Sequence, residues 1–247
     1  DDGKYAETDA VTFILTKKHL ITLRYSDPRS FSLFAEYAKK HPYVCISSDV
    51  VFQWLLDSII NRLADIIDNI GEDLNAISST IFEFKSDRRS KIMKFPSNSL
   101  HKILKEIGRI GDIAAKIRES LHSVDRTLIF FTHSERAKSS EDSLARVKAL
   151  RTDIHSLSEQ ALFISHEVNF LLSATLGMIN IEQTNISKIF SVFAVLFLPP
   201  TLVASIYGMN FQHMPGLDSV WAYILALVVM VGVGVGPYMY FKKRGWL

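Results

Sequence analysis

A long apolar stretch near the C-terminus restricts what this chain can fold into. Between Ile189 and Phe241 the only formally charged side chain is Asp218, although 22% of all residues are charged. Residues 189–207 and 220–241 are each about as long as a helix must be to cross the roughly 30 Å of bilayer hydrocarbon. The sequence therefore predicts two transmembrane helices, joined by a loop over 208–219, behind a charged N-terminal part.

Composition and motifs exclude several classes of function. The net charge is only +2 and no basic stripe is interleaved with aromatic residues, so we expect no nucleic-acid partner. Cys45 is the single cysteine, which rules out an intrachain disulfide and fits a reducing compartment. The eight histidines lack metal-ligand spacing, and no phosphate-binding loop or catalytic triad pattern occurs. We therefore expect no enzyme activity, no organic cofactor and no tight zinc site within one chain.

The distribution of Lys and Arg predicts the orientation of the two spans. Lys188 precedes the first span, and Lys242, Lys243 and Arg244 follow the second, whereas the connecting loop has no basic residue. Because cytoplasmic flanks carry the excess of Lys and Arg, both termini are expected in the cytoplasm and the loop outside. The basic tail at 242–247 would then be cytoplasmic.

Helix-breaking and small residues mark both spans. Pro199 and Pro200 lie in the middle of the first, so the carbonyls four residues earlier lose their helical partners. In lipid this is costly unless protein or water satisfies them, which is typical of a helix that lines a wet path. A simple kink within a helix pair is the alternative. In the second span, Gly232 and Gly236 form a small-xxx-small pair that predicts helix packing.

The N-terminal part begins with short elements. Apolar runs over 12–15 and 20–25, separated by a short polar turn, predict a β-hairpin. A break at Asp27-Pro28 precedes a predicted helix over 31–39.

Three long helical stretches follow, over about 49–84 with Ser47 or Ser48 as the cap, from about Ser97, and from about Ser143. In each, apolar residues recur at alternating steps of three and four, which indicates helices that pack lengthwise. The polar break Thr132–Asp142 predicts an antiparallel hairpin of the second and third. The expected seam residues are Ile59, Leu63, Ile66, Ile70, Leu74, Ile77 and Ile81; Leu100, Ile103, Ile107, Ile110, Ala114, Ile117, Leu121, Val124, Leu128 and Phe131; and Val147, Leu150, Ile154, Leu157, Ala161, Ile164, Val168 and Leu171.

No proline interrupts the chain between Pro96 and Pro199, so the third helix is expected to run from Ser143 to Ile206, into the membrane. Its seam turns polar after Leu171, continuing through Thr175, Met178, Glu182 and Asn185. That change fits either an ion vestibule or a solvated helix face.

The loop after the first span opens with Tyr207-Gly208-Met209-Asn210-Phe211, and the chain ends with Tyr240-Phe241-Lys242-Lys243-Arg244-Gly245-Trp246-Leu247. A Gly-Met-Asn motif between two C-terminal spans, a basic tail and a long helical stalk together resemble the CorA family of magnesium channels. The resemblance is strong from about Gln183 to the end and architectural over the rest. It departs at Gly216, where the family usually has Glu, and at Thr184, where a pore-facing Asn is common.

The resemblance implies an α+β membrane protein that assembles as a funnel-shaped homopentamer. Its expected parts are a remnant of a cytoplasmic α/β domain over 1–46, a helical part of the funnel over 47–142, a stalk helix over 143–188, a pore-lining first transmembrane helix over 189–207, an external filter loop over 208–219, a second transmembrane helix over 220–241 and the tail over 242–247. The family usually has a longer N-terminal α/β domain, so this one is expected to be partial.

The resemblance also assigns an ion path. Gly208, Met209 and Asn210 would form the outer selectivity filter. The pore-lining face of the first span would comprise Thr184, Ser187, Phe190, Ser191, Ala194, Leu198, Thr201 and Ser205. Neutral oxygens suit Mg²⁺, which sheds its water reluctantly, and apolar rings at Leu198 and Phe190 can close a pore by dewetting.

The implied function is a passive Mg²⁺ channel in the bacterial inner membrane, driven by the membrane potential and also passing Co²⁺ and Ni²⁺. Cytosolic Mg²⁺ would gate it through carboxylates between subunits; the candidates are Asp153, Asp65, Asp68 and Glu72. Mg²⁺ is thus both the transported and the regulatory ion. The alternatives are a zinc transporter of the ZntB kind with the same architecture, or a non-conducting, membrane-anchored coiled-coil signalling protein.

Overall fold

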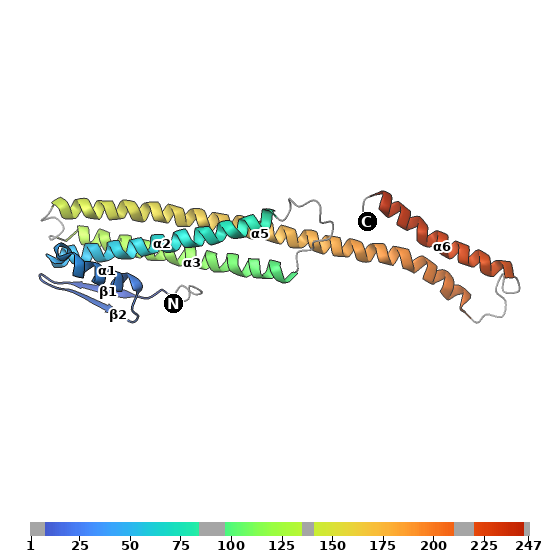
Figure 1. Cartoon of the computed structure of the whole chain (residues 1–247), viewed down its shortest axis with the longest axis horizontal. Coiled ribbons are helices and arrows are strands. Elements are labelled where there is room, and N and C mark those ends of the chain that lie inside the picture. Colours follow the sequence, from blue (N-terminus) through green and yellow to red (C-terminus); the bar gives the residue numbers. More distant parts are fainter. Residues whose placement is uncertain (1–7, 84–96, 135–140, 210–219, 245–247) are drawn as a thin grey trace. The chain divides into compact units, whose positions relative to one another are not determined.

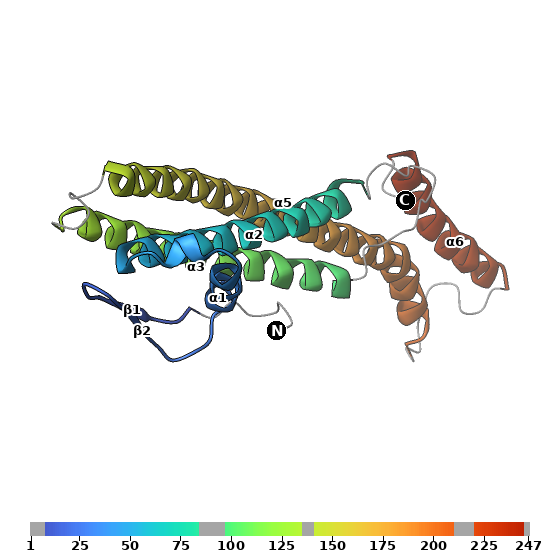
Figure 2. The same cartoon turned by 60° about the vertical axis from the view of Figure 1, so that its left-hand side comes forward.

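The computed structural model describes residues 8–83, 97–134, 141–209 and 220–244 (Figures 1 and 2). The chain divides into two compact units, Asp1–Thr175 and Leu176–Leu247. The long helix α5 contributes to both.

The first unit opens with the predicted hairpin. Strands β1 (Val11–Leu15) and β2 (Leu20–Arg24) pair antiparallel, with Phe13 opposite Thr22. The turn is closed by Thr16, whose hydroxyl donates to the carbonyl of His19 at 2.8 Å and accepts the backbone N–H of His19 at 2.9 Å. The Phe13 ring meets the edge of the Phe52 ring on the following long helix at 5.5 Å, so one face of the hairpin packs on the helices.

Helix α1 (Arg29–Lys40) and a short 3-10 helix η1 (Pro42–Cys45) lead into α2 (Ser48–Glu83). Of the two expected caps, Ser47 acts as the N-cap, because its hydroxyl accepts the N–H of Val50 at 3.3 Å. Ser48 instead donates to the carbonyl of Thr16 at 2.8 Å and ties the start of α2 to the hairpin.

Helices α2 and α3 (Ser97–Thr132) are antiparallel. Near one end the rings of Phe52 and Phe131 lie 5.2 Å apart, and further along Arg109 donates to Asp73 at 2.9 Å. From the first pair to the second, the residue number rises along α2 and falls along α3, so the two helices are antiparallel.

Helix α5 (Glu141–Tyr207) completes a three-helix bundle with its first half (Figure 1). Gln53 donates to Ser143, and Gln160 donates to Asp68 at 3.2 Å, so α2 and α5 run parallel. The hairpin of α3 and α5 is antiparallel as predicted: Arg151 of α5 pairs with Asp125 of α3 at 2.7 Å.

The bundle core confirms most of the expected seams. Eight of the ten predicted residues of α3 and seven of the eight of α5 are buried. On α2 the prediction was partly wrong, because Ile59, Leu63, Ile66 and Ile77 are only half-buried. Ile70, Leu74 and Ile81 are buried as predicted. Ile60 and Ile67, each one position after a predicted residue, are buried in place of Ile59 and Ile66, and with Leu74 and Ile81 they follow a heptad spacing.

The buried seam of α5 ends in the region where the sequence predicted a change to polar residues. Thr175 is fully buried and satisfies its hydroxyl by donating to the carbonyl of Leu171 at 2.7 Å, whereas Asn185 is exposed. The choice between a vestibule and a solvated face stays open.

The second unit contains the end of α5 and helix α6 (Val220–Lys243). Both helices are long and apolar enough to cross a membrane, with mean hydropathies of 2.2 and 2.0 over their most apolar windows. Only 6% and 0% of those windows are buried, whereas a core helix of a soluble protein would be mostly buried. The two predicted apolar helices are therefore present, and α5 continues into its span without a break.

Candidate ion pathway on the first membrane helix

The predicted pore-lining residues share one face of α5. Thr184, Ser187, Ser191, Ala194, Leu198, Thr201 and Ser205 follow one another at steps of three and four, which keeps them in one stripe. All of these residues and Phe190 are exposed in the single chain, and the side chains of Phe190 and Leu198 are 70% and 66% exposed. We call this set the α5 stripe.

Helix α6 lies against a different face of α5. A Cβ placed on Gly234 of α6 would be 3.6 Å from the ring of Pro200 and 3.8 Å from the carbonyl oxygen of Leu196. Leu196 precedes the stripe residue Leu198 by two positions, which is about 200° around a helix at about 100° per residue. The chain's own second span therefore leaves the stripe uncovered.

One of the two carbonyls that the Pro-Pro pair leaves without a helical partner lies beside α6. Pro200 cannot donate to the carbonyl of Leu196, and that carbonyl lies on the side of Gly234, away from the stripe. For Pro200 this arrangement fits a kink within a helix pair, because Gly234 has no side chain and leaves room for the altered turn. Within the described residues, nothing lies within 4 Å of a Cβ on Gly232 or Gly236, so their expected packing role stays a prediction.

Part of the α5 stripe is hollowed. Ala194, Leu198, Thr201 and Ser205 line a groove of about 450 Å³ together with Phe197 and Leu202. The last two residues were missed by sequence reasoning. Each lies next to a stripe residue in sequence, and large apolar side chains beside a polar stripe were the signal that could have indicated them.

The hydroxyl groups of the stripe are oriented by their own helix. Thr184, Ser191 and Thr201 each donate to the carbonyl four residues earlier, at 2.8, 2.9 and 2.7 Å. A hydroxyl that has used its only hydrogen in this way presents oxygen lone pairs to its surroundings. The stripe therefore offers hydrogen-bond acceptors, set among apolar side chains.

The Gly-Met-Asn motif begins where α5 ends. The N–H of Gly208 donates to the carbonyl of Ala204 at 2.9 Å, and that of Met209 donates to Ile206 at 3.3 Å. A Cβ on Gly208 would come within 3.1 Å of the Ala204 carbonyl oxygen, so the motif's glycine fits a tight approach. Asn210, the residue expected to contact the ion, lies outside the described residues, as does the rest of the loop to residue 219.

The four candidate sensing carboxylates do not converge within one chain. Asp65 lies 3.9 Å from Arg62, Asp68 accepts from Gln160, and Glu72 and Asp153 are exposed. Within the described ranges, no group of three or more His, Cys, Asp or Glu side chains could hold a metal ion.

A half-buried carboxyl that the sequence did not single out lies near Asp153. Burial raises the pKa of Asp57; the charge of Arg146 opposes this, and that of Asp153 adds to it. The Arg146 guanidinium in turn lies 3.5 Å from the centroid of the Trp54 ring. The signal for Asp57 was its place on α2 between the apolar pairs Leu55-Leu56 and Ile59-Ile60.

The fold resembles those of two solved proteins. The CorA magnesium transporter from Methanocaldococcus jannaschii superposes with a TM-score of 0.71 at 14% identity, covering 97% of this chain and 80% of that one. The full-length CmaX protein gives 0.60 at 16% identity, covering 96% and 68%. A helical bundle whose longest helix continues into an apolar unit, with two helices long enough to span a bilayer, is the architecture of an integral membrane protein.

The sequence comparisons identify the family. A model of the CorA-like Mg²⁺ transporter protein matches residues 1–243. The magnesium transport protein CorA of Haemophilus ducreyi is 35% identical and that of Yersinia pestis 36% identical, each over 247 residues. Both alignments cover 100% of this chain and 74% of the relative. The chain belongs to the CorA-like Mg²⁺ transporter family.

Proposed function

We propose that this protein is a passive Mg²⁺ channel, built as a homopentamer in which α5 of each copy lines a central path. The observation that carries the proposal is the uncovered α5 stripe. The hydroxyl groups of Ser191, Thr201 and Ser205 lie in an apolar span, on the face that α6 does not cover. Polar groups within a span normally face other protein or water. We therefore expect several copies of α5 to surround an axis, with their stripes facing it.

The chemistry of the stripe suits a hydrated divalent cation. Mg²⁺ usually keeps several of its waters, and those waters donate hydrogen bonds outward. Thr184, Ser191 and Thr201 present acceptor lone pairs because their hydrogens are already used. A ring of such neutral oxygens can hold the hydrated ion without forming a trap too deep to leave.

Large apolar residues on the same stripe could close the ion path. Phe190 and Leu198 are exposed on the stripe, and Leu198 lines the groove together with Phe197. Rings of such side chains around an axis would exclude water and stop conduction. We assign the outer filter to Gly208, Met209 and Asn210, with the amide oxygen of Asn210 as first contact for the hydrated ion.

The ion would be driven inward by the membrane potential alone. A divalent cation gains about 4.6 kcal/mol on crossing 100 mV, twice the single-charge value. We propose the bacterial inner membrane as the location, with both termini cytoplasmic because Lys242, Lys243 and Arg244 follow the second span. Co²⁺ and Ni²⁺ are proposed as further permeant ions.

Gating by cytosolic Mg²⁺ is proposed to act through carboxylates of the first unit. Asp153 is the main candidate because it is exposed on α5, the helix that continues into the membrane, and its charge acts on Asp57. Asp65, Asp68 and Glu72 on α2 are the remaining candidates.

Uptake by proteoliposomes tests the function. Asn210→Ala is expected to reduce Mg²⁺ uptake at least tenfold while the protein still inserts and assembles, because the filter loses its amide oxygen. The matched control is Asn61→Ala, at an exposed position of α2, which should leave uptake unchanged. Normal uptake by the Asn210 variant would refute the channel. Competition by Zn²⁺ and Ni²⁺ in the same vesicles separates the magnesium channel from the zinc-transporting alternative.

A further inference from the structure

We propose that a collar of basic side chains at one end of the two membrane helices binds the headgroups of anionic phospholipids. The collar consists of Lys188 on α5 and of Lys242, Lys243 and Arg244, which form and directly follow the end of α6. The inference goes beyond the proposed conduction of Mg²⁺, and it uses the proposed assembly only to place α6 next to lipid.

The four cations lie at a similar level of the second unit. Helix α6 contacts α5 at Gly234, where a Cβ would be 3.6 Å from Pro200 and 3.8 Å from the carbonyl oxygen of Leu196. The cations of α6 follow Gly234 by about 12–15 Å along the helix, and Lys188 precedes Leu196 and Pro200 by about 12–18 Å. Because the two helices run in opposite directions (Figures 1 and 2), both distances lead to the same end of the pair.

The collar coincides with the edge of the apolar part of both helices. Lys188 directly precedes the apolar stretch of α5, and Lys242 directly follows that of α6. Tyr238 and Tyr240, in the last turn before the cations of α6, are 42% and 54% exposed. Exposed tyrosine rings beside basic residues are typical of a helix end at the level of the lipid headgroups.

The positive charge of the collar is not balanced by described residues of the second unit. Among residues 176–209 and 220–244, Glu182 is the only acidic side chain. It lies six residues before Lys188, about 9 Å along α5. Within these ranges no ion pair joins any of the four cations to a carboxylate. All four side chains are exposed, so their charge is available to a partner.

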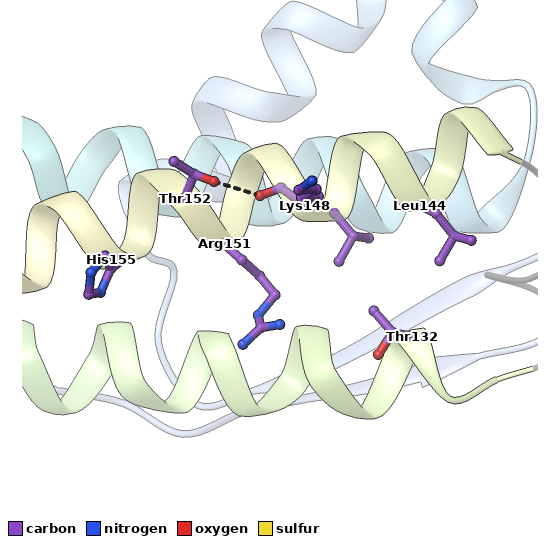
Figure 3. A pocket seen from close by; sticks show the side chains of 7 residues that line it. Thr132, Leu144, Lys148, Arg151, Thr152 and His155 are labelled. Carbon is purple, nitrogen blue, oxygen red and sulfur yellow. Dashed lines mark hydrogen bonds between the residues drawn. The ribbon is translucent and has the colours of Figure 1, made fainter.

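A basic groove of the first unit shows the contrasting case. Figure 3 shows Arg151 pointing from α5 toward α3, where its Nε donates to Asp125 at 2.7 Å. His155, in the same groove, lies 3.4 Å from Glu159. These basic side chains have acidic neighbours within the chain, whereas those of the collar face outward without one in the described ranges.

Part of the collar points away from α5. Helix α6 turns a half-buried stripe toward α5, with steps of three and four between Ala226, Met230, Gly234, Pro237 and Phe241. Lys243 is two residues after Phe241, about 200° around the helix, so it projects to the other side. In the proposed oligomer the α5 stripe faces the axis and α6 lies on another side of α5, so Lys243 would face lipid.

The guanidinium of Arg244 is held beside an aromatic ring. Its Cζ lies 5.1 Å from the centroid of the Tyr240 ring, and the backbone N–H of Arg244 donates to the carbonyl of Tyr240 at 3.1 Å. The Tyr240 ring in turn makes an edge contact with the Phe241 ring at 5.8 Å. A guanidinium placed over a ring keeps its N–H groups for an anion, and a phosphodiester offers paired oxygens that suit them.

Anionic phospholipids match the collar in both charge and position. Basic side chains beside a span attract anionic headgroups, and the attraction falls off within a Debye length of the surface. A soluble phosphate has the charge but no acyl chains to hold it at the edge of the bilayer. We therefore assign the collar to lipid headgroups.

Native mass spectrometry of the full chain in detergent measures this preference. The protein is offered equal concentrations of phosphatidylglycerol and phosphatidylcholine with identical acyl chains. The wild type should retain at least about fivefold more phosphatidylglycerol. The preference should fall toward one when ammonium acetate rises from about 0.1 to about 1 M, because the Debye length shortens from about 10 to about 3 Å. Glycerol 3-phosphate at millimolar concentration should not displace the lipid.

Variants assign the preference to the collar. Lys242→Gln/Lys243→Gln should lower it to less than about twofold. The matched control Lys102→Gln/Lys105→Gln removes the same charge from exposed positions of α3 and should keep it. Lys242→Arg/Lys243→Arg keeps the charge and should keep the preference. The salt response of the wild type decides the question even where a Gln variant fails to insert.

Equal retention of the two lipids by the wild type would overturn the collar as a lipid site. Displacement by glycerol 3-phosphate, or an equal loss in the α3 control, would overturn it too. Uptake of Mg²⁺ separates this outcome from the fate of the proposed function. A chain that conducts without any lipid preference overturns the collar alone, and one that prefers the anionic lipid without conducting overturns the channel alone.

Discussion

At the scale of single residues, Gly234 sets how closely the two membrane helices approach. A methyl group there would be in ordinary contact with Pro200, at 3.6 Å, whereas a longer side chain would meet both the proline ring and the carbonyl of Leu196. The position therefore tolerates alanine and excludes bulk, because α6 lies on the turn of α5 that the prolines alter.

We expect Gly234→Leu to lower the free energy of unfolding by about 1–3 kcal/mol through overpacking, whereas Gly234→Ala changes it little. The measurement is a denaturant titration of the detergent-solubilised protein, followed by helicity. Gly232→Leu is the matched control, since nothing lies within 4 Å of a Cβ there. Equal losses in the two Leu variants would contradict the assigned helix contact.

At the scale of elements, the three-helix bundle is held by buried seams. Leu121 of α3 is fully buried and Leu74 of α2 likewise, whereas Leu162 on α5 is 41% exposed. Polar contacts such as Asp73 with Arg109 lie at the bundle surface, where exposed ion pairs contribute little. Most of the stability of the bundle is therefore expected from the apolar seams.

Leu121→Ala is expected to destabilise the protein by about 2–5 kcal/mol, because it removes buried methyl groups and leaves a cavity. Leu162→Ala makes the same chemical change at a partly exposed site and should cost less than about 1 kcal/mol. Chemical unfolding of the full chain monitored by circular dichroism compares the two. Similar losses would show that Leu121 does not lie in the core.

At the scale of the whole molecule, the proposed channel has a single source of energy. The roughly 4.6 kcal/mol per 100 mV available to a divalent ion is enough to hold a concentration ratio above a thousandfold. In proteoliposomes, an inside-negative potassium diffusion potential should accelerate Mg²⁺ uptake, and its collapse should stop uptake against a gradient. Uptake that continued against a gradient without a potential would point to a pump.

Much of the fold could be predicted from patterns that act locally. The hairpin, the bounds of α2, α3 and α5, and the two apolar spans follow from turn residues, caps and hydrophobic periodicity. The α2 seam was misplaced because both Ile59 and Ile60, and both Ile66 and Ile67, are apolar. Only the neighbouring helices decide which member of each pair is buried. The sequence also left open whether Pro199 and Pro200 indicate a wet path or a kink within a helix pair, because this too depends on the neighbouring helices.

The sequence by itself determined the membrane spans, the stripe of hydroxyl groups at helical spacing and the motif that follows, since composition and a period of 3.6 residues are properties of one segment. Tertiary structure alone decided that Gly234, not Gly232 or Gly236, contacts α5. It also decided that the half-buried Asp57 lies within the field of Asp153 and Arg146. These facts depend on which faces of separate helices meet, and this is settled by packing between residues far apart in the chain.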